Sequence, residues 1–218
     1  MTKHDFHIRS ILIALALFCG IASSVWAATI FQQNFESTPI GPLGSPWTIT
    51  SAGSGSVSVV NTSDHGHILQ LRGSTTEGDF LIASRRFSSS SSDITTQVDI
   101  KPSSGSAFLW ILNGAGSSIG KRRIRLQQAP GTTTLVASTA PSGNTNCGTI
   151  PSGVWSHITL RVHSAQAKFD VLINGKATAC TGISAGIQPP FNSVSVMDAS
   201  NAGWGGTVLF DNIVVTSP

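Results

Sequence analysis

The chain has no tyrosine, and only 11% of its 218 residues are charged. Its formal net charge of +3 is small and does not indicate a nucleic acid or a membrane surface as partner. Beyond residue 27, no apolar run is long enough to cross a bilayer. No later window keeps a 3.6-residue apolar period for more than a couple of turns, which argues against a helical or α/β architecture.

Residues 1–27 have the features of a cleavable secretory signal. Lys3 and Arg9 form a basic start, an apolar run occupies 11–18, and small residues stand at the two positions that signal peptidase reads. We therefore expect cleavage after Ala27 and export to the periplasm or the extracellular medium. An uncleaved anchor is the alternative, but the apolar run is short for a membrane-spanning helix.

Two cysteines, Cys147 and Cys180, remain beyond the signal segment. An even pair in an exported chain most simply predicts a disulfide bond. In the chain-entropy model such a bond contributes roughly 3.5 to 4 kcal/mol to stability. Two buried free thiols are the alternative. A zinc site is not expected, because no CxxC or HxxxH spacing accompanies the cysteines.

Short alternating segments, separated by glycine, serine, proline and asparagine, make up the rest of the chain. Apolar and polar residues alternate in four segments, 94–100, 108–112, 158–163 and 169–173. The last of these leads into Asn174-Gly175, a dipeptide typical of a two-residue β-hairpin turn. The pattern predicts one all-β domain over 28–218, a sandwich or a barrel, with no internal repeat.

Four segments carry a resemblance to a known family. They are Phe31–Glu36, Trp155–His163, Phe169–Lys176 and Leu209–Val215. Together they resemble the concanavalin A-like lectin/glucanase jelly rolls, in particular the laminin G-like branch of secreted bacterial proteins. The resemblance covers nearly all of 29–216 and implies a two-sheet antiparallel jelly-roll sandwich in which the first and last strands pair. The last strand carries apolar residues on both of its faces. This agrees with the implied pairing, because a strand buried on both faces lies within a sheet.

The terminal strands contribute two acids, Glu36 and Asp211. Many jelly rolls that these termini resemble hold a structural calcium ion there, bound by carboxylate and carbonyl oxygens. The resemblance therefore implies calcium as a cofactor at these two residues. Alternatively, both acids accept backbone N–H groups or face solvent. His65 and His67 flank a glycine, but Asp64-His65-Gly66 is more typical of a turn than of a metal site.

The candidate ligand-binding residues are Arg123, Arg125, Arg161 and Trp204. Arg123 and Arg125 share one strand face, and a planar guanidinium group suits the carboxylates of an acidic polysaccharide. Arg161 belongs to a second polar strand face that could lie beside the first. Trp204 stands in a glycine-rich loop and could stack on a sugar ring. The alternatives are ordinary solvated strand faces and core packing of the tryptophan.

Catalytic patterns of the jelly rolls that the chain resembles are missing. Their glucanases use an E-x-D-x-x-E strand motif, whereas this chain has only two glutamates, Glu36 and Glu77. Their polysaccharide lyases use a tyrosine, which this chain lacks. We therefore expect a secreted, non-catalytic carbohydrate-binding or lectin-like module with no catalytic residues. A structural or adhesive extracellular domain that binds protein partners is the first alternative, and a polysaccharide-degrading enzyme is the second.

Overall fold

The structure is a computed structural model that describes residues 27–74, 76, 78–90, 93–104, 106–114, 122–139, 143–184, 190–199 and 206–218. The expected signal segment lies outside the described residues, except for Ala27. Within the described ranges, no helix has the length and apolar character needed to cross a membrane.

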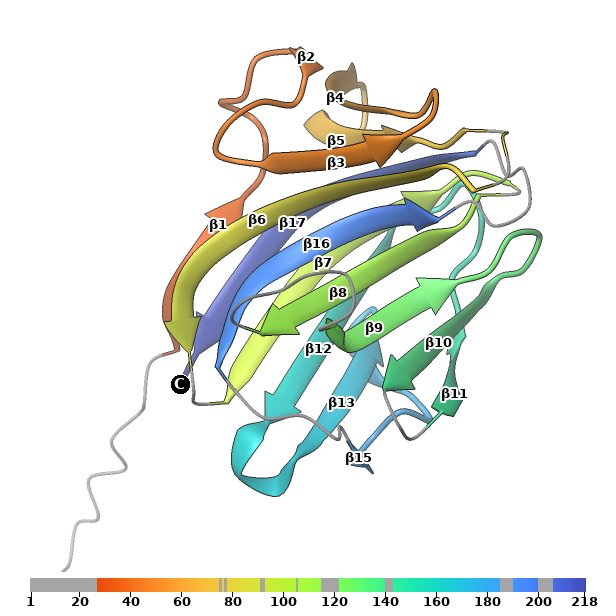
Figure 1. Ribbon diagram of the computed structural model, residues 1–218. Coiled ribbons are helices and arrows are strands. Elements are labelled where there is room, and N and C mark those ends of the chain that lie inside the picture. The colour runs from red at the N-terminus through yellow and green to blue at the C-terminus, as the bar shows by residue number, and fades with distance from the viewer. Residues whose placement is uncertain are drawn as a thin grey trace, which may run out of the picture.

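Two antiparallel sheets lie face to face and form a jelly-roll sandwich (Figure 1). The ten-stranded sheet has the order β14-β13-β12-β7-β17-β5-β4-β2, with β1 paired to β17 and β15 paired to β13. Its strands are β1 (Ala28–Gln33), β2 (Gly41–Pro42), β4 (Ser56–Thr62), β5 (Gly66–Arg72), β7 (Ile94–Pro102), β12 (Ser156–His163), β13 (Lys168–Ile173), β14 (Lys176–Ala177), β15 (Ile183–Ser184) and β17 (Thr207–Ser217).

The seven-stranded sheet has the order β11-β10-β9-β8-β16-β6-β3. Its strands are β3 (Thr48–Ala52), β6 (Phe80–Ser90), β8 (Phe108–Gly114), β9 (Arg122–Gln128), β10 (Thr134–Thr139), β11 (Gly143–Thr149) and β16 (Phe191–Ala199). A short 3-10 helix, η2 (Ser164–Gln166), connects β12 to β13.

The main core fills the space between the two sheets. The predicted alternation is confirmed, since every second residue of β7 from Ile94 to Ile100 is buried. On β8, Phe108, Trp110 and Leu112 face the same core. The indole Nε1 of Trp110 donates a hydrogen bond to Thr96 Oγ1 at 3.2 Å, so this tryptophan joins the two sheets and is a core residue.

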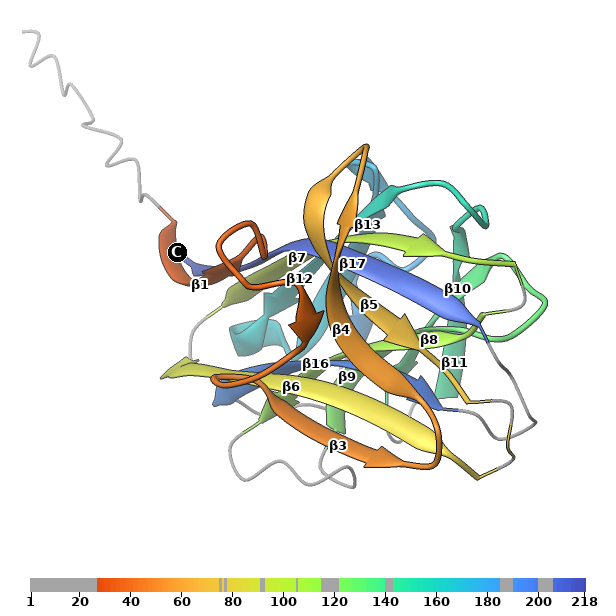
Figure 2. The same cartoon turned by 90° about the horizontal axis from the view of Figure 1, so that it is seen from above.

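The last strand, β17, lies inside the ten-stranded sheet, between β7 and β5 (Figure 2). It also pairs with β1, where Ala28 is opposite Ser217, so the pairing of the first and last strands is confirmed. A bulge interrupts β17 at Asn212, which has a φ of +48°. Asparagine tolerates this left-handed conformation better than most residues. The bulge leaves Asp211 opposite Asp99 of β7.

The hairpin and the disulfide bond are both confirmed. Asn174 and Gly175 have φ values of +51° and +74° and connect β13 to β14. The return strand comprises only Lys176–Ala177. Cys147 and Cys180 are bonded, with their Cα atoms 4.9 Å apart. The bond therefore connects β11, at the edge of one sheet, to the segment that follows β14, at the edge of the other.

Candidate functional site

The outer face of the seven-stranded sheet, called here the seven-stranded face, is built from directly paired residues that point to the same side. One row across it consists of Thr48, Ser84, Ser195, Ile111, Arg125, Ser138 and Asn144. The next row consists of Thr50, Ile82, Met197, Leu109, Gln127, Val136 and Asn146. Neither row contains an acidic residue.

The middle of the seven-stranded face is apolar and shielded from solvent. Ile82, Leu109, Ile111 and Met197 form a buried cluster there, separate from the main core. Sequence alternation assigned Phe108, Trp110 and Leu112 to the core but did not anticipate this second burial on β8. Beside the cluster, Ser195 Oγ is hydrogen-bonded to Ser84 Oγ at 2.9 Å and accepts a bond of 2.9 Å from the Asn113 amide.

Arg125 extends from β9 next to this apolar cluster. Its Nη2 atom donates a 2.9 Å hydrogen bond to Ser138 Oγ. Its Nε atom is buried and has no hydrogen-bond partner among the described residues. Burial lowers the pKa of the guanidinium group from its ordinary value. Arg125 is thus a partly desolvated cation whose donors are not all used inside the protein.

The structure does not bring all the predicted ligand-binding residues together. Arg123 belongs to the same strand as Arg125, β9. Arg161 belongs to β12 of the other sheet, where it stands opposite Asp170 of β13 in the strand register. The expectation that the two arginine-bearing faces lie beside each other is therefore not met, because the strands belong to different sheets. Trp204 lies outside the described residues.

Histidine and aspartate residues pair along the outer face of the ten-stranded sheet, called here the ten-stranded face. His157 Nδ1 lies 2.6 Å from Asp99 Oδ1, and His163 Nε2 lies 2.9 Å from Asp170 Oδ2. Desolvation acts to raise the pKa of Asp170. Hydrogen bonds from His163 and from the Gly182 N–H, together with nearby positive charge, outweigh it and lower this pKa below the ordinary value.

The segment 63–65 forms the predicted turn between β4 and β5. Asp64 Oδ2 accepts hydrogen bonds of 2.9 Å from Lys101 Nζ and from Trp155 Nε1. These bonds, the one from Lys101 first, hold the pKa of Asp64 well below its usual range. The ring of His65 stacks on Trp155 at a centroid distance of 4.1 Å. His67 Nδ1 donates to the Thr38 carbonyl oxygen at 3.1 Å.

The two terminal acids both contact this turn. The Glu36 carboxylate lies over Gly66, at a place where a Cβ atom would collide with it. Asp211 is buried, its Oδ2 lies 3.2 Å from His65 Nδ1, and its Oδ1 accepts the Asn212 N–H at 2.7 Å. Burial is the main cause that raises the pKa of Asp211. Two carboxylates at one turn fit the oxygen donors that calcium prefers, although His65 faces one oxygen of Asp211.

A further acidic pocket was missed from the sequence. Asp79 and Asp198 line it, at one end of the sandwich. Burial raises the pKa of Asp198 to about 6. The signal was present in the sequence, because Asp198 is in phase with Val194 and Val196, which face the core. No group of three or more histidine, cysteine, aspartate or glutamate residues in the described ranges is arranged to hold a metal ion.

Comparisons with known proteins identify the fold. No protein-family model matches the chain, and no curated protein matches its sequence. A sialidase structure superposes with a TM-score of 0.67 at 14% identity over 88% of this chain, which spans only 18% of the sialidase. The cellulose-induced protein Cip1 gives 0.64 at 14% identity over 86% of this chain and 97% of its own. Lectin UEA-II, solved with galactose, gives 0.55 at 13% identity over 87% and 99%. The chain therefore has a concanavalin A-like fold.

Proposed function

We propose that this chain is an exported, non-catalytic carbohydrate-binding module whose seven-stranded face binds an acidic polysaccharide through Arg125. The observation that carries the proposal is the buried Nε of Arg125, which has no hydrogen-bond partner among the described residues. A lectin of similar fold, solved with galactose, supports the ligand class by analogy of fold.

An anionic sugar matches the chemistry of the seven-stranded face. A planar guanidinium group donates two parallel hydrogen bonds to a carboxylate, and such charge-assisted bonds are about twice as strong as neutral ones. No acid in either row of the face competes for Arg125. Gln127, Ser138 and Asn144 lie beside it and offer uncharged donors and acceptors to sugar hydroxyls. A uronic-acid-containing polymer would use both kinds of group.

Export and the calcium ion belong to the same proposal. Residues 1–27 would direct the chain to the periplasm or the extracellular medium, and the laminin G-like resemblance agrees with a secreted module. Calcium would bind between Glu36 and Asp211 and would hold the β4–β5 turn against β17. We expect calcium to raise the melting temperature of chelator-treated protein, and Glu36→Gln to reduce this shift. A melting temperature that calcium leaves unchanged would remove the ion from the proposal.

Binding to an acidic-glycan array followed by titration calorimetry tests the sugar site. Arg125→Ala should weaken binding to a uronic-acid polymer at least tenfold, because a charge-assisted hydrogen bond contributes about 1.5 to 3 kcal/mol. Arg161→Ala is the matched control, since it removes the same charge from the other sheet and should leave the affinity unchanged. Arg125→Lys should keep only part of the affinity, because lysine retains the charge without the planar fork.

Two results would overturn the proposed site. Equal weakening by Arg125→Ala and Arg161→Ala would show general electrostatic attraction without a defined face. A folded parent protein that binds no glycan would favour the alternative of a structural or adhesive domain with protein partners. A salt titration distinguishes general electrostatic attraction from binding at a defined face, because salt screens the attraction between exposed charges most readily.

A further inference from the structure

We propose that a divalent cation, Ca²⁺ in the first instance, binds in the pocket formed by Asp79, Asp198 and Ser74. This site is distinct from the terminal acids, because its residues come from β16 and from the segment that precedes β6. It is also independent of the sugar site proposed above.

The position of Asp198 follows from strand alternation. On β16, Val194 and Val196 face the main core, and Asp198 is the next residue in the same phase. Its directly paired neighbour on β6 is Leu81, which is also a core residue. An ionisable side chain therefore points to the inner side of the sandwich, at the end where the strand leaves the core.

One carboxylate oxygen of Asp198 has no hydrogen-bond partner in the part of the chain that the structure describes. Only 5% of the residue is exposed, and its Oδ1 atom is buried with no hydrogen-bond partner among the described residues. Leaving a buried carboxylate unpaired is unfavourable, so such a group is usually paired, protonated or bound to a metal ion. No lysine, arginine or histidine lines the pocket, so no basic side chain there provides a salt bridge.

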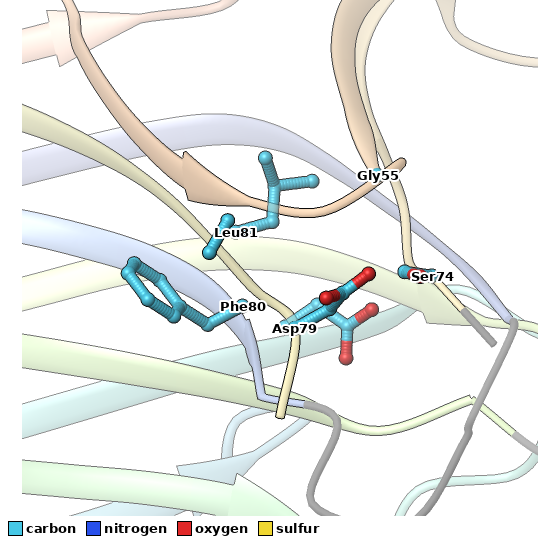
Figure 3. Close-up of a pocket in the computed structure, with 7 residues that line it drawn as sticks. Gly55, Ser74, Asp79, Phe80 and Leu81 are labelled. Atoms are coloured by element: carbon cyan, nitrogen blue, oxygen red, sulfur yellow. The ribbon is translucent and has the colours of Figure 1, made fainter. Parts of the chain in front are cut away.

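A second carboxylate lies in the same pocket (Figure 3). Asp79 packs on Gly53, where a Cβ atom would collide with the carboxylate, and its Oδ2 accepts the Ser54 N–H at 3.3 Å. Gly53 has a φ of +93°, a conformation that other residues rarely adopt. The turn between β3 and β4 thus holds Asp79 in place. Ser74 completes the set, with its Oγ atom 3.1 Å from Ser54 Oγ.

The donors that line the pocket select the ligand. Two carboxylates and a hydroxyl are hard oxygen donors, and calcium accepts such a set with water completing six to eight ligands. Magnesium requires a near-octahedral arrangement and keeps its water more firmly, so it should bind more weakly here.

Calcium titration of chelator-treated protein, followed by calorimetry, tests the site. Asp198→Asn and Asp79→Asn should each lower the calcium stoichiometry by one relative to the parent, or weaken that site at least tenfold. Asp211→Asn should leave this site intact, because it alters only the terminal acids. Asp93→Asn removes the same charge from a residue near η2 and serves as the matched control. Ser74→Ala should produce a smaller loss than either acidic variant and does not change a charge.

Three outcomes would overturn the proposal. The first is that the parent protein binds no calcium. The second is that the Asp79 and Asp198 variants bind calcium as the parent does. The third is that Asp198→Asn raises the melting temperature while calcium changes the melting temperature of neither protein. The last outcome would mean that Asp198 holds only a proton. Glycan binding by Asp198→Asn should equal that of the parent, so failure of the cation site and failure of the sugar site are distinguishable.

Discussion

The two sheets of the sandwich differ in where their polar groups find partners. All ion pairs among the described residues lie on the ten-stranded face and its β4–β5 turn. Buried polar side-chain atoms without a hydrogen bond lie, in the described ranges, almost entirely on strands of the seven-stranded sheet, and Ser156 is the exception. These atoms belong to Arg85, Arg125, Gln128, Asn192 and Asp198.

This contrast separates a structural network from a candidate binding surface. On the ten-stranded face, Asp99 bridges two strands, because it contacts His157 of β12 and accepts a 2.8 Å bond from the Asn212 amide of β17. Each aspartate of these ion pairs has a hydrogen-bond partner in the protein. On the seven-stranded sheet, the Nε atom of Arg125 and the Oδ1 atom of Asp198 have no such partner among the described residues. Buried polar groups are normally hydrogen-bonded, so the exceptions are the places where an external ligand is expected.

Truncating a side chain in the apolar centre of the seven-stranded face should give the largest loss of stability. Ile111→Ala should reduce the free energy of unfolding by about 2 to 4 kcal/mol, because it opens a cavity among buried side chains. Thr95→Ala on the ten-stranded face is the control, with an expected change below about 0.5 kcal/mol. Urea denaturation measures both. Equal effects would contradict the view that only one outer face has its own apolar core.

The ion pairs of the ten-stranded face should contribute less, and in a pH-dependent way. Asp170 has a lowered pKa in the folded state, so its contribution is present above its ordinary pKa of 3.8 and is lost as the pH falls through the folded-state value. Asp170→Asn should therefore destabilise the protein at pH 7 by up to about 1 kcal/mol, since the pair is partly exposed. The difference from the parent should shrink in acid. A difference that persists at pH 2 would show that packing, and not charge, connects Asp170 to His163.

The sequence predicts the elements of this fold better than it predicts their neighbours. Alternation in β7, the Asn174-Gly175 turn and the cysteine pair are local or nearly local signals, and each is confirmed. Assigning Arg125 and Arg161 to different sheets requires long-range strand pairing, which alternation does not encode. The two residues look alike in sequence because each is a basic residue at a polar position of a strand.

The candidate site was predicted only in part for a related reason. Arg125 was identified by residue type, whereas its buried Nε depends on what surrounds it in the fold. Asp198 was overlooked although its phase with Val196 indicated an inward position. Burial of Leu109 and Ile111 on the outer face was also not predictable. An apolar residue on the face of a strand opposite the core can be exposed or buried, and the sequence alone does not distinguish the two.

Replacing Arg125 by methionine should have the smallest effect on stability, and this makes it the sharpest test of the contrast. Methionine keeps an unbranched side chain as far as the position of Nε, removes the unpaired N–H and can pack against Ile111, the directly paired residue on β8. The free energy of unfolding should stay within about 0.5 kcal/mol of the parent, while binding of a uronic-acid polymer is lost. Arg161→Met should leave both quantities nearly unchanged. If Arg125→Met instead costs more than about 2 kcal/mol, the Nε atom has a partner inside the protein, and the seven-stranded face is as self-contained as the ten-stranded one.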